Sequence, residues 1–213
     1  MKSELRKWLA CADFQKVLDA ASDSSRIIGT LITLTYSDDP LVSWRAIDAV
    51  GRCAARLSPD RPIIIVNYLR RLFWMMSDES GSVAPHAPEV IGEIISSNPK
   101  EFIDFIPLTV SLMDLEPEDR PLFLPGILYA LGRIGEAAPG TIEDSLDGIE
   151  RSLGEPDAQA RAMAVWCLGR IRRQDMLLRH PELEQDDGKA RIYRKEYIID
   201  TTVAELFLKT TSK

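Results

Sequence analysis

The sequence predicts an all-α protein of about four helix pairs, followed by a small β-hairpin and a last helix. Three observations lead to this fold class. One glycine recurs at regular intervals inside apolar helical stretches, a second apolar stretch precedes each of them, and acidic turns separate the two. The 213 residues, 45% hydrophobic and 28% charged, are enough to bury a core without disulfide or metal support.

Four stretches align on a glycine each, at intervals of 41, 40 and 37 residues. The glycines are Gly51, Gly92, Gly132 and Gly169. Positions −5, −1 and +2 from each glycine are small or apolar, which predicts an amphipathic helix with one buried face. In the order of the four glycines, position −5 holds Ala46, Ala87, Ile127 and Ala164. Position −1 holds Val50, Ile91, Leu131 and Leu168, and position +2 holds Cys53, Ile94, Ile134 and Ile171. Small residues at −5 and at the glycine allow a neighbouring helix to approach closely.

Each glycine helix follows another apolar stretch, so the two form a pair. These first helices are expected in 24–37, 62–76, 101–115 and 141–153. The turns after them, at 38–40, 78–81, 116–119 and 154–157, contain acidic residues that suit a helix N-cap.

Four prolines fall inside or near the expected helices. Pro85 and Pro88 lie in a first turn if the second glycine helix begins near Pro85. Pro125 is accommodated in the same way if the third glycine helix starts late. Pro107 predicts a kink or break in 101–115.

Both ends of the chain are expected to close the array, as repeat proteins require. Residues 3–21 predict an N-terminal capping helix, and the helix pairs occupy about 22–175 of an array that spans 1–180. Residues 181–213 form the C-terminal cap, in which alternation in ARIYRKEYIIDT predicts the hairpin, with Ile192, Tyr197 and Ile199 as candidates for burial. The capping-box sequence Thr202–Glu205 then opens the last helix.

The repeated unit combines an acidic turn, x-Arg-x-x-Ala and Ala-Leu-Gly-Arg-Ile, and it resembles the HEAT repeat. It is most similar to the short bacterial and archaeal HEAT-like repeats of the bilin-lyase type. Residues Asp157–Ile171 and Ala130–Gly135 match best, 38–53 match well, and 78–94 depart with His-Ala-Pro. The resemblance implies a HEAT-like solenoid, a right-handed α-α superhelix whose second helices line the concave side.

A second stripe on the glycine helices, at positions −7, −3 and +1, faces away from the core. With one arginine beyond the last helix it gives the expected binding residues: Trp44, Asp48, Arg52, Glu89, Glu93, Tyr129, Arg133, Trp166, Arg170 and Arg173. Aromatic and arginine side chains are typical of binding hot spots, although the aromatics could equally pack against neighbouring repeats. Residues 158–213 carry 11 basic and 8 acidic residues, and 1–157 carry 15 and 25. Such a bipolar groove is expected to orient an acidic segment of a partner.

No motif for catalysis or metal binding occurs in the sequence. His86 and His180 lie 94 residues apart without ligand spacing, and a P-loop, GxSxG and GxGxxG are all absent. Cys53 and Cys167 fall on core positions and are expected to be inert thiols. We therefore expect no enzymatic activity, no metal and no cofactor. Three cysteines without a CxxC pair, and no signal-peptide or membrane-spanning stretch, predict a cytoplasmic protein.

Three functions compete. The first is a non-catalytic scaffold that binds another protein along the concave stripe. The second, implied by the resemblance, is a tetrapyrrole-binding, bilin-lyase-like protein or chaperone, with Trp166, Tyr129 and Arg170 on the ring. The third, implied by a HEAT-like DNA-glycosylase family, would use Trp44, Asp48 and Trp166, but a net charge of −7 opposes phosphate binding. We expect the scaffold, with a protein partner and neither nucleic acid nor membrane; the oligomeric state stays open.

Overall fold

The computed structural model describes residues 1–76, 84, 86–114 and 120–212. The chain forms two compact units, Met1–Phe105 and Ile106–Lys213. The described part of the chain is helical apart from one two-stranded sheet. The predicted class, an all-α array of helix pairs with a small C-terminal hairpin and helix, is confirmed.

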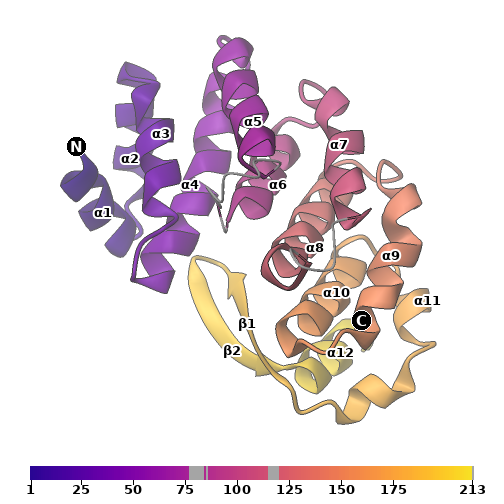
Figure 1. Cartoon of the computed structure of the whole chain (residues 1–213). Coiled ribbons are helices and arrows are strands. Elements are labelled where there is room, and N and C mark those ends of the chain that lie inside the picture. Colours follow the sequence, from indigo (N-terminus) through magenta and orange to yellow (C-terminus); the bar gives the residue numbers. More distant parts are fainter. Residues whose placement is uncertain (77–83, 85, 115–119, 213) are drawn as a thin grey trace. The chain divides into compact units, whose positions relative to one another are not determined.

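The first unit contains two glycine helices and their partners (Figure 1). Its elements are α1 (Lys2–Ala10), α2 (Phe14–Asp23), α3 (Arg26–Leu34), α4 (Pro40–Leu57), α5 (Pro62–Met76), α6 (Ala87–Ser97) and a 3-10 turn at Ile103–Phe105. The glycine helices are α4 and α6, which pack against each other. Helices α3 and α5 are the first helices of these pairs, as expected.

Residues 3–21, expected as a single capping helix, form the two helices α1 and α2. Ala12 has a φ of 55°, which the interior of a right-handed helix does not accommodate. The side chain of Asp13 then accepts a hydrogen bond from the backbone N–H of Lys16 at 3.3 Å and caps α2. A local side-chain cap therefore divides the segment.

The second unit contains two further glycine helices and the C-terminal cap (Figure 1). Its elements are α7 (Ile106–Ser111), α8 (Arg120–Ala137), α9 (Leu146–Arg151), α10 (Ala158–Arg170), α11 (Gln174–Leu177), β1 (Lys189–Arg194), β2 (Tyr197–Thr202) and α12 (Val203–Thr211). Short 3-10 segments flank α7 and α9 and precede β1. The glycine helices α8 and α10 pack against each other, and α12 packs on α10.

The hairpin forms where the alternation predicts it, but only one of its strands is well covered. β1 and β2 are antiparallel with Ile192 opposite Ile199, and Lys195 and Glu196 turn the chain with φ of 49° and 68°. Ile192 is buried, whereas Tyr197 and Ile199 are 64% and 43% exposed. The expected burial of these two is wrong, because α10 packs against β1.

Three of the four repeated glycines, Gly51, Gly132 and Gly169, mark places where the next helix approaches. A Cβ at Gly51 would lie 2.9 Å from the Cβ of Glu93 in α6, and one at Gly132 would lie 2.5 Å from the Trp166 ring in α10. A Cβ at Gly169 would lie 2.5 Å from Thr210 of α12. Any larger residue would push these helices apart, which confirms the close approach that the small residues predict.

The helix starts follow the acidic residues where the structure describes them. Asp39 accepts hydrogen bonds from the backbone N–H groups of Leu41 and Val42, and Asp157 from those of Gln159 and Ala160. The acidic turns expected at 78–81 and 116–119, and Pro85, lie outside the described residues.

Two prolines have different outcomes. Pro107 falls where a 3-10 turn gives way to the short α7, which matches the expected break. Pro125 lies inside α8, because that helix begins at Arg120 rather than late. An interior proline costs about 3 kcal/mol. The burial of Leu124, Ile127 and Leu128 on the same helix offsets that cost.

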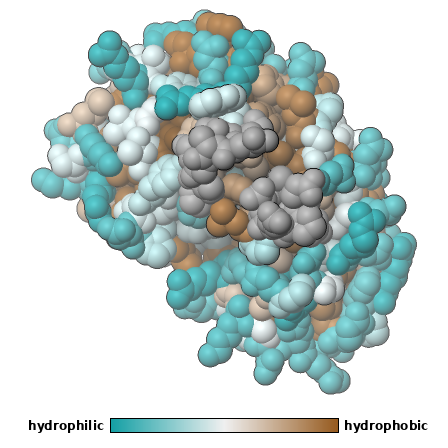
Figure 2. Space-filling view, viewed as in Figure 1, coloured by the Kyte–Doolittle hydropathy of each residue, from teal (hydrophilic) through white to brown (hydrophobic). Residues whose placement is uncertain are grey.

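The core follows the predicted stripe. Of the twelve residues at positions −5, −1 and +2, eleven are buried and only Ile171 is intermediate. Several large apolar side chains are exposed: Ile63 and Trp74 of α5, Leu178 after α11 and Tyr197 of β2 are among them. Figure 2 shows hydrophilic residues over much of the face drawn, with apolar ones in smaller groups between them.

Candidate functional site

In the first unit, the predicted site residues belong to α4 and α6, which pack against each other, and Arg52 reaches toward α2. Asp48 accepts two hydrogen bonds from Arg52, at 2.7 and 3.0 Å, and the Arg52 guanidinium lies 3.8 Å from the centre of the Phe14 ring. Glu89 and Glu93 are each only 6% exposed. This half of the stripe is therefore largely engaged in contacts within the chain.

The most constrained of these residues is Glu89. Its Oε1 lies 3.0 Å from Nδ1 of His86, whereas its Oε2 is buried without a hydrogen-bond partner. The His86 ring also lies 6.0 Å from the Trp44 ring. Burial lowers the pKa of His86, but the hydrogen bond to Glu89 and its charge outweigh burial and raise the pKa above the ordinary 6.5. The contact with Glu89 thus favours the protonated form of the His86 ring.

In the second unit, the two predicted aromatics stack on each other. The Tyr129 and Trp166 rings are 5.1 Å apart with an angle of 9° between their planes, and Tyr129 is only 5% exposed. Trp166 also covers Gly132. This geometry favours packing between repeats for Tyr129, and it leaves that ring no open face for the tetrapyrrole of the alternative function.

Of the three predicted arginines of this unit, Arg170 contacts the aromatic pair, Arg133 shares its ion-pair partner, and Arg173 lies beyond the end of α10. The Arg170 guanidinium lies 5.4 Å from the centre of the Trp166 ring and forms an ion pair with Glu136. Arg133 contacts the same carboxylate at 3.5 Å. Arg173 contacts Asp175 at 3.1 Å. The side chains of Arg133, Arg170 and Arg173 are 30%, 39% and 32% exposed, so they remain accessible from solvent.

The chemistry available in these places is binding by charge and by aromatic contact. No group of three His, Cys, Asp or Glu that could hold a metal ion occurs among the described residues. Cys53 and Cys167 are both fully buried. Burial raises the pKa of Cys53 to about 12, and it raises the pKa of Cys167 as well. Over the described residues, no helix has the length and apolar character needed to cross a bilayer.

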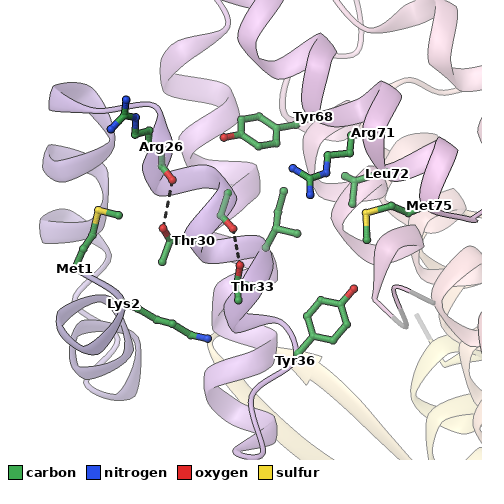
Figure 3. Close-up of a pocket in the computed structure, with 12 residues that line it drawn as sticks. Met1, Lys2, Arg26, Thr30, Thr33, Tyr36, Tyr68, Arg71, Leu72 and Met75 are labelled. Carbon is green, nitrogen blue, oxygen red and sulfur yellow. Dashed lines mark hydrogen bonds between the residues drawn. The ribbon is translucent and has the colours of Figure 1, made fainter. Parts of the chain in front are cut away.

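A pocket in the first unit was not found from the sequence. It has a volume of about 560 Å³ and is lined by α1, α3, α5 and the residue Tyr36 (Figure 3). The only local signal is the spacing of Arg26, Gly29, Thr30 and Thr33, which places them on one side of α3. The remaining lining residues come from distant parts of the sequence.

The folded elements define the class of this protein as a helical-repeat protein with a hairpin cap. No family model matches the sequence. An uncharacterized protein of Archaeoglobus fulgidus is 33% identical over 138 residues, which cover 65% of this chain and 70% of that one. The chain belongs to the same family as that archaeal protein.

Two solved structures are similar to the chain. An engineered protein has 15% sequence identity and a TM-score of 0.51, over 99% of this chain and 95% of that one, so the two share a fold. The archaeal HEAT-like repeats protein from Thermococcus onnurineus NA1 has 18% identity and a TM-score of 0.43, over 99% of this chain and 78% of that one.

Proposed function

We propose that this chain is a non-catalytic interaction protein built of HEAT-like repeats, which binds an acidic segment of another protein on the second unit. The observation that carries the proposal is the pair of partly exposed arginines Arg133 and Arg170 on the shared Glu136, with Arg170 beside the Trp166 ring that stacks on Tyr129. Arg173 adds a further partly exposed cation beyond the end of α10. Arginine next to a rigid aromatic surface is typical of protein-binding hot spots. A cytoplasmic location is part of the proposal, since the three cysteines are free thiols.

The ion pairs of these arginines are exposed enough for an external carboxylate to compete with them. The Arg170 side chain is 39% exposed, so a partner can reach its guanidinium, although its Nε is buried and is not the point of contact. Glu136 and Asp175 are 39% and 56% exposed, and ion pairs at such positions contribute only about 0–1 kcal/mol. A partner's carboxylate can therefore replace them at little cost, provided that it brings a better geometry.

The charge of the C-terminal part of this unit, which contains Arg170 and Arg173, supports an acidic occupant there. Residues 158–213 carry 11 basic and 8 acidic residues, whereas the chain as a whole has a net charge of −7. An acidic segment is thus attracted to the arginines and repelled by the remainder of the chain, which favours one position and direction.

The test is the binding of a fluorescein-labelled, glutamate-rich peptide, followed by anisotropy at low salt. We expect Arg133→Gln/Arg170→Gln to weaken binding by about tenfold or more, because two charge-assisted contacts are lost. The matched control is Arg191→Gln/Arg194→Gln, which removes the same charge from exposed residues of β1. Equal affinities for the two double variants would contradict the proposal.

Capture of partners from a cell lysate extends the test to natural ligands. Wild type and Arg133→Gln/Arg170→Gln serve as baits, because substitution of Trp166 would also disturb its packing on Gly132. We expect a protein with an acidic segment in the wild-type eluate and a clear loss of it with the variant. Identical eluates, or a coloured tetrapyrrole in place of a protein, would refute this assignment.

A further inference from the structure

The pocket of about 560 Å³ in the first unit has the size of a small-molecule site, since such sites usually span about 300–1,000 Å³. It is open to solvent over α3, with α1 on one side and α5 on the other (Figure 3). All of the residues that line it belong to the first unit. The inference is therefore independent of the arginines of the second unit.

The charge in this pocket is positive. Lys2 reaches toward α3 from α1, and Arg71 reaches toward it from α5, as Figure 3 shows. Arg26 is a third cation in the lining. Among the described residues, no carboxylate lines the pocket and none of these three cations forms an ion pair. Lys2 and Arg71 both face this cavity without a counter-charge in its lining, so an anion bound there is attracted by both.

Hydrogen-bond donors in the pocket come mainly from the cations and one tyrosine. Thr30 and Thr33 already donate their hydroxyl hydrogens to the carbonyl oxygens of Arg26 and Gly29, at 3.3 and 3.0 Å. Tyr36 is 47% exposed. Burial raises its pKa even though the charge of Arg71 acts in the opposite direction. Its hydroxyl therefore stays protonated at neutral pH and can donate to an anion.

The walls between these polar groups are apolar. Leu72 and Met75 of α5 and Ile32 of α3 contribute aliphatic surface. The Tyr68 ring packs against Gly29: a Cβ added to this glycine would lie 3.6 Å from the nearest carbon of the ring. An inorganic anion alone would leave this apolar surface exposed to water, whereas a ligand with an apolar part would cover it.

We infer that the pocket between α1, α3 and α5 binds a small organic anion, whose charged group lies between Lys2 and Arg71 and whose apolar body packs on Leu72, Met75 and Tyr68. The polar groups select the charge and the apolar walls supply the buried area, which is the usual division in small-molecule sites.

The experiment titrates the full chain with 8-anilinonaphthalene-1-sulfonate, a fluorescent aromatic anion, and compares two variants of α5. Arg71→Gln removes a lining cation, and Arg70→Gln removes the same charge from the neighbouring exposed residue, which does not line the pocket. We expect the first to weaken binding by about tenfold and the second to leave it unchanged. Thr33→Trp, which fills the pocket from an exposed position on α3, is expected to abolish binding while circular dichroism stays that of the wild type.

Three further results would overturn the inference. One is an equal effect of the two arginine variants. Another is equal affinity for 1-anilinonaphthalene, which lacks the sulfonate, since the cations would then contribute nothing. The third is displacement of the dye by inorganic phosphate or by a glutamate-rich peptide as effectively as by an organic carboxylate such as decanoate, since the occupant would then be a simple anion or a protein segment.

Discussion

At the scale of single residues, the buried polar groups of the first unit serve the ends of neighbouring helices. Arg45 is 4% exposed, and its Nη1 donates to the carbonyl oxygens of Leu9 and Ala10 at the end of α1, at 2.9 and 2.8 Å. Ser43 donates to the carbonyl of Thr35 just beyond α3, at 2.6 Å. Carbonyls at helix ends lack intrahelical donors. These side chains therefore join α4 to α1 and to the end of α3.

The pair of His86 and Glu89 predicts a dependence of stability on pH. Because the pKa of His86 is above 6.5 in the folded protein, folding favours the protonated ring. This contribution is complete below about pH 6.5 and is lost as the pH rises through the raised value. We expect the urea midpoint to fall between about pH 6 and pH 9 in the wild type, and to fall less in His86→Gln. His180→Gln is the control, and an identical slope in both variants would argue against the pair.

The three cysteines predict a simple thiol titration. Cys11 is exposed, whereas Cys53 and Cys167 are buried and carry raised pKa values. With Ellman's reagent, we expect one thiol to react quickly in the native protein and the other two only after unfolding. Cys11→Ser should remove the fast phase entirely. A fast phase that persisted in this variant would show that one of the buried thiols is accessible.

At the scale of elements, the contacts of Gly51, Gly132 and Gly169 with the next helix define how the helices stack. The seam between α8 and α10 depends on Gly132, over which the Trp166 ring lies. In contrast, Gly154 has nothing within 4 Å of the place where a Cβ would stand. The two glycines thus offer a matched pair of substitutions within one unit.

We expect Gly132→Ala to lower the free energy of unfolding by about 1–3 kcal/mol, because the added methyl group meets Trp166 and the backbone of Cys167. Gly154→Ala should change it by less than about 0.5 kcal/mol. Urea denaturation followed by circular dichroism measures both values. Equal losses would mean that the contact with Trp166 does not decide the effect, since alanine by itself favours a helix more than glycine does.

The sequence allowed most elements to be predicted, because the interval between glycines and the apolar stripe both depend on local periodicity. It did not reveal what covers the second stripe. Periodicity gives the angle of a side chain around its helix, but the burial of Glu89 and Tyr129 depends on the neighbouring helix. The pocket was missed for a related reason, since Lys2, Arg26 and Arg71 come together only when three helices pack.

At the scale of the whole molecule, charge is the property that restricts partners most directly. A chain with a net charge of −7 repels a phosphate backbone, and nucleic-acid binding depends strongly on neutralising phosphates with basic residues. The arginines of the second unit are paired in part with Glu136, Glu143 and Asp175. The proposal of a protein partner without a nucleic-acid partner follows from this balance.

We expect no retardation of a duplex oligonucleotide in a native gel at low ionic strength, where electrostatic binding is strongest. A basic DNA-binding protein run beside it serves as the positive control. A shifted band that disappears as salt is added would contradict the expectation and would reopen the glycosylase alternative.

The position of α12 over Gly169 limits how the repeat series can grow. Thr210 of α12 lies against Gly169 in the same way that Trp166 lies against Gly132 and Glu93 lies against Gly51. A pair added after α10 would have to displace α12 together with the hairpin that leads into it. A lengthened relative or a designed extension is therefore expected to carry its additional pairs ahead of α10, with the hairpin and α12 retained as the terminal module.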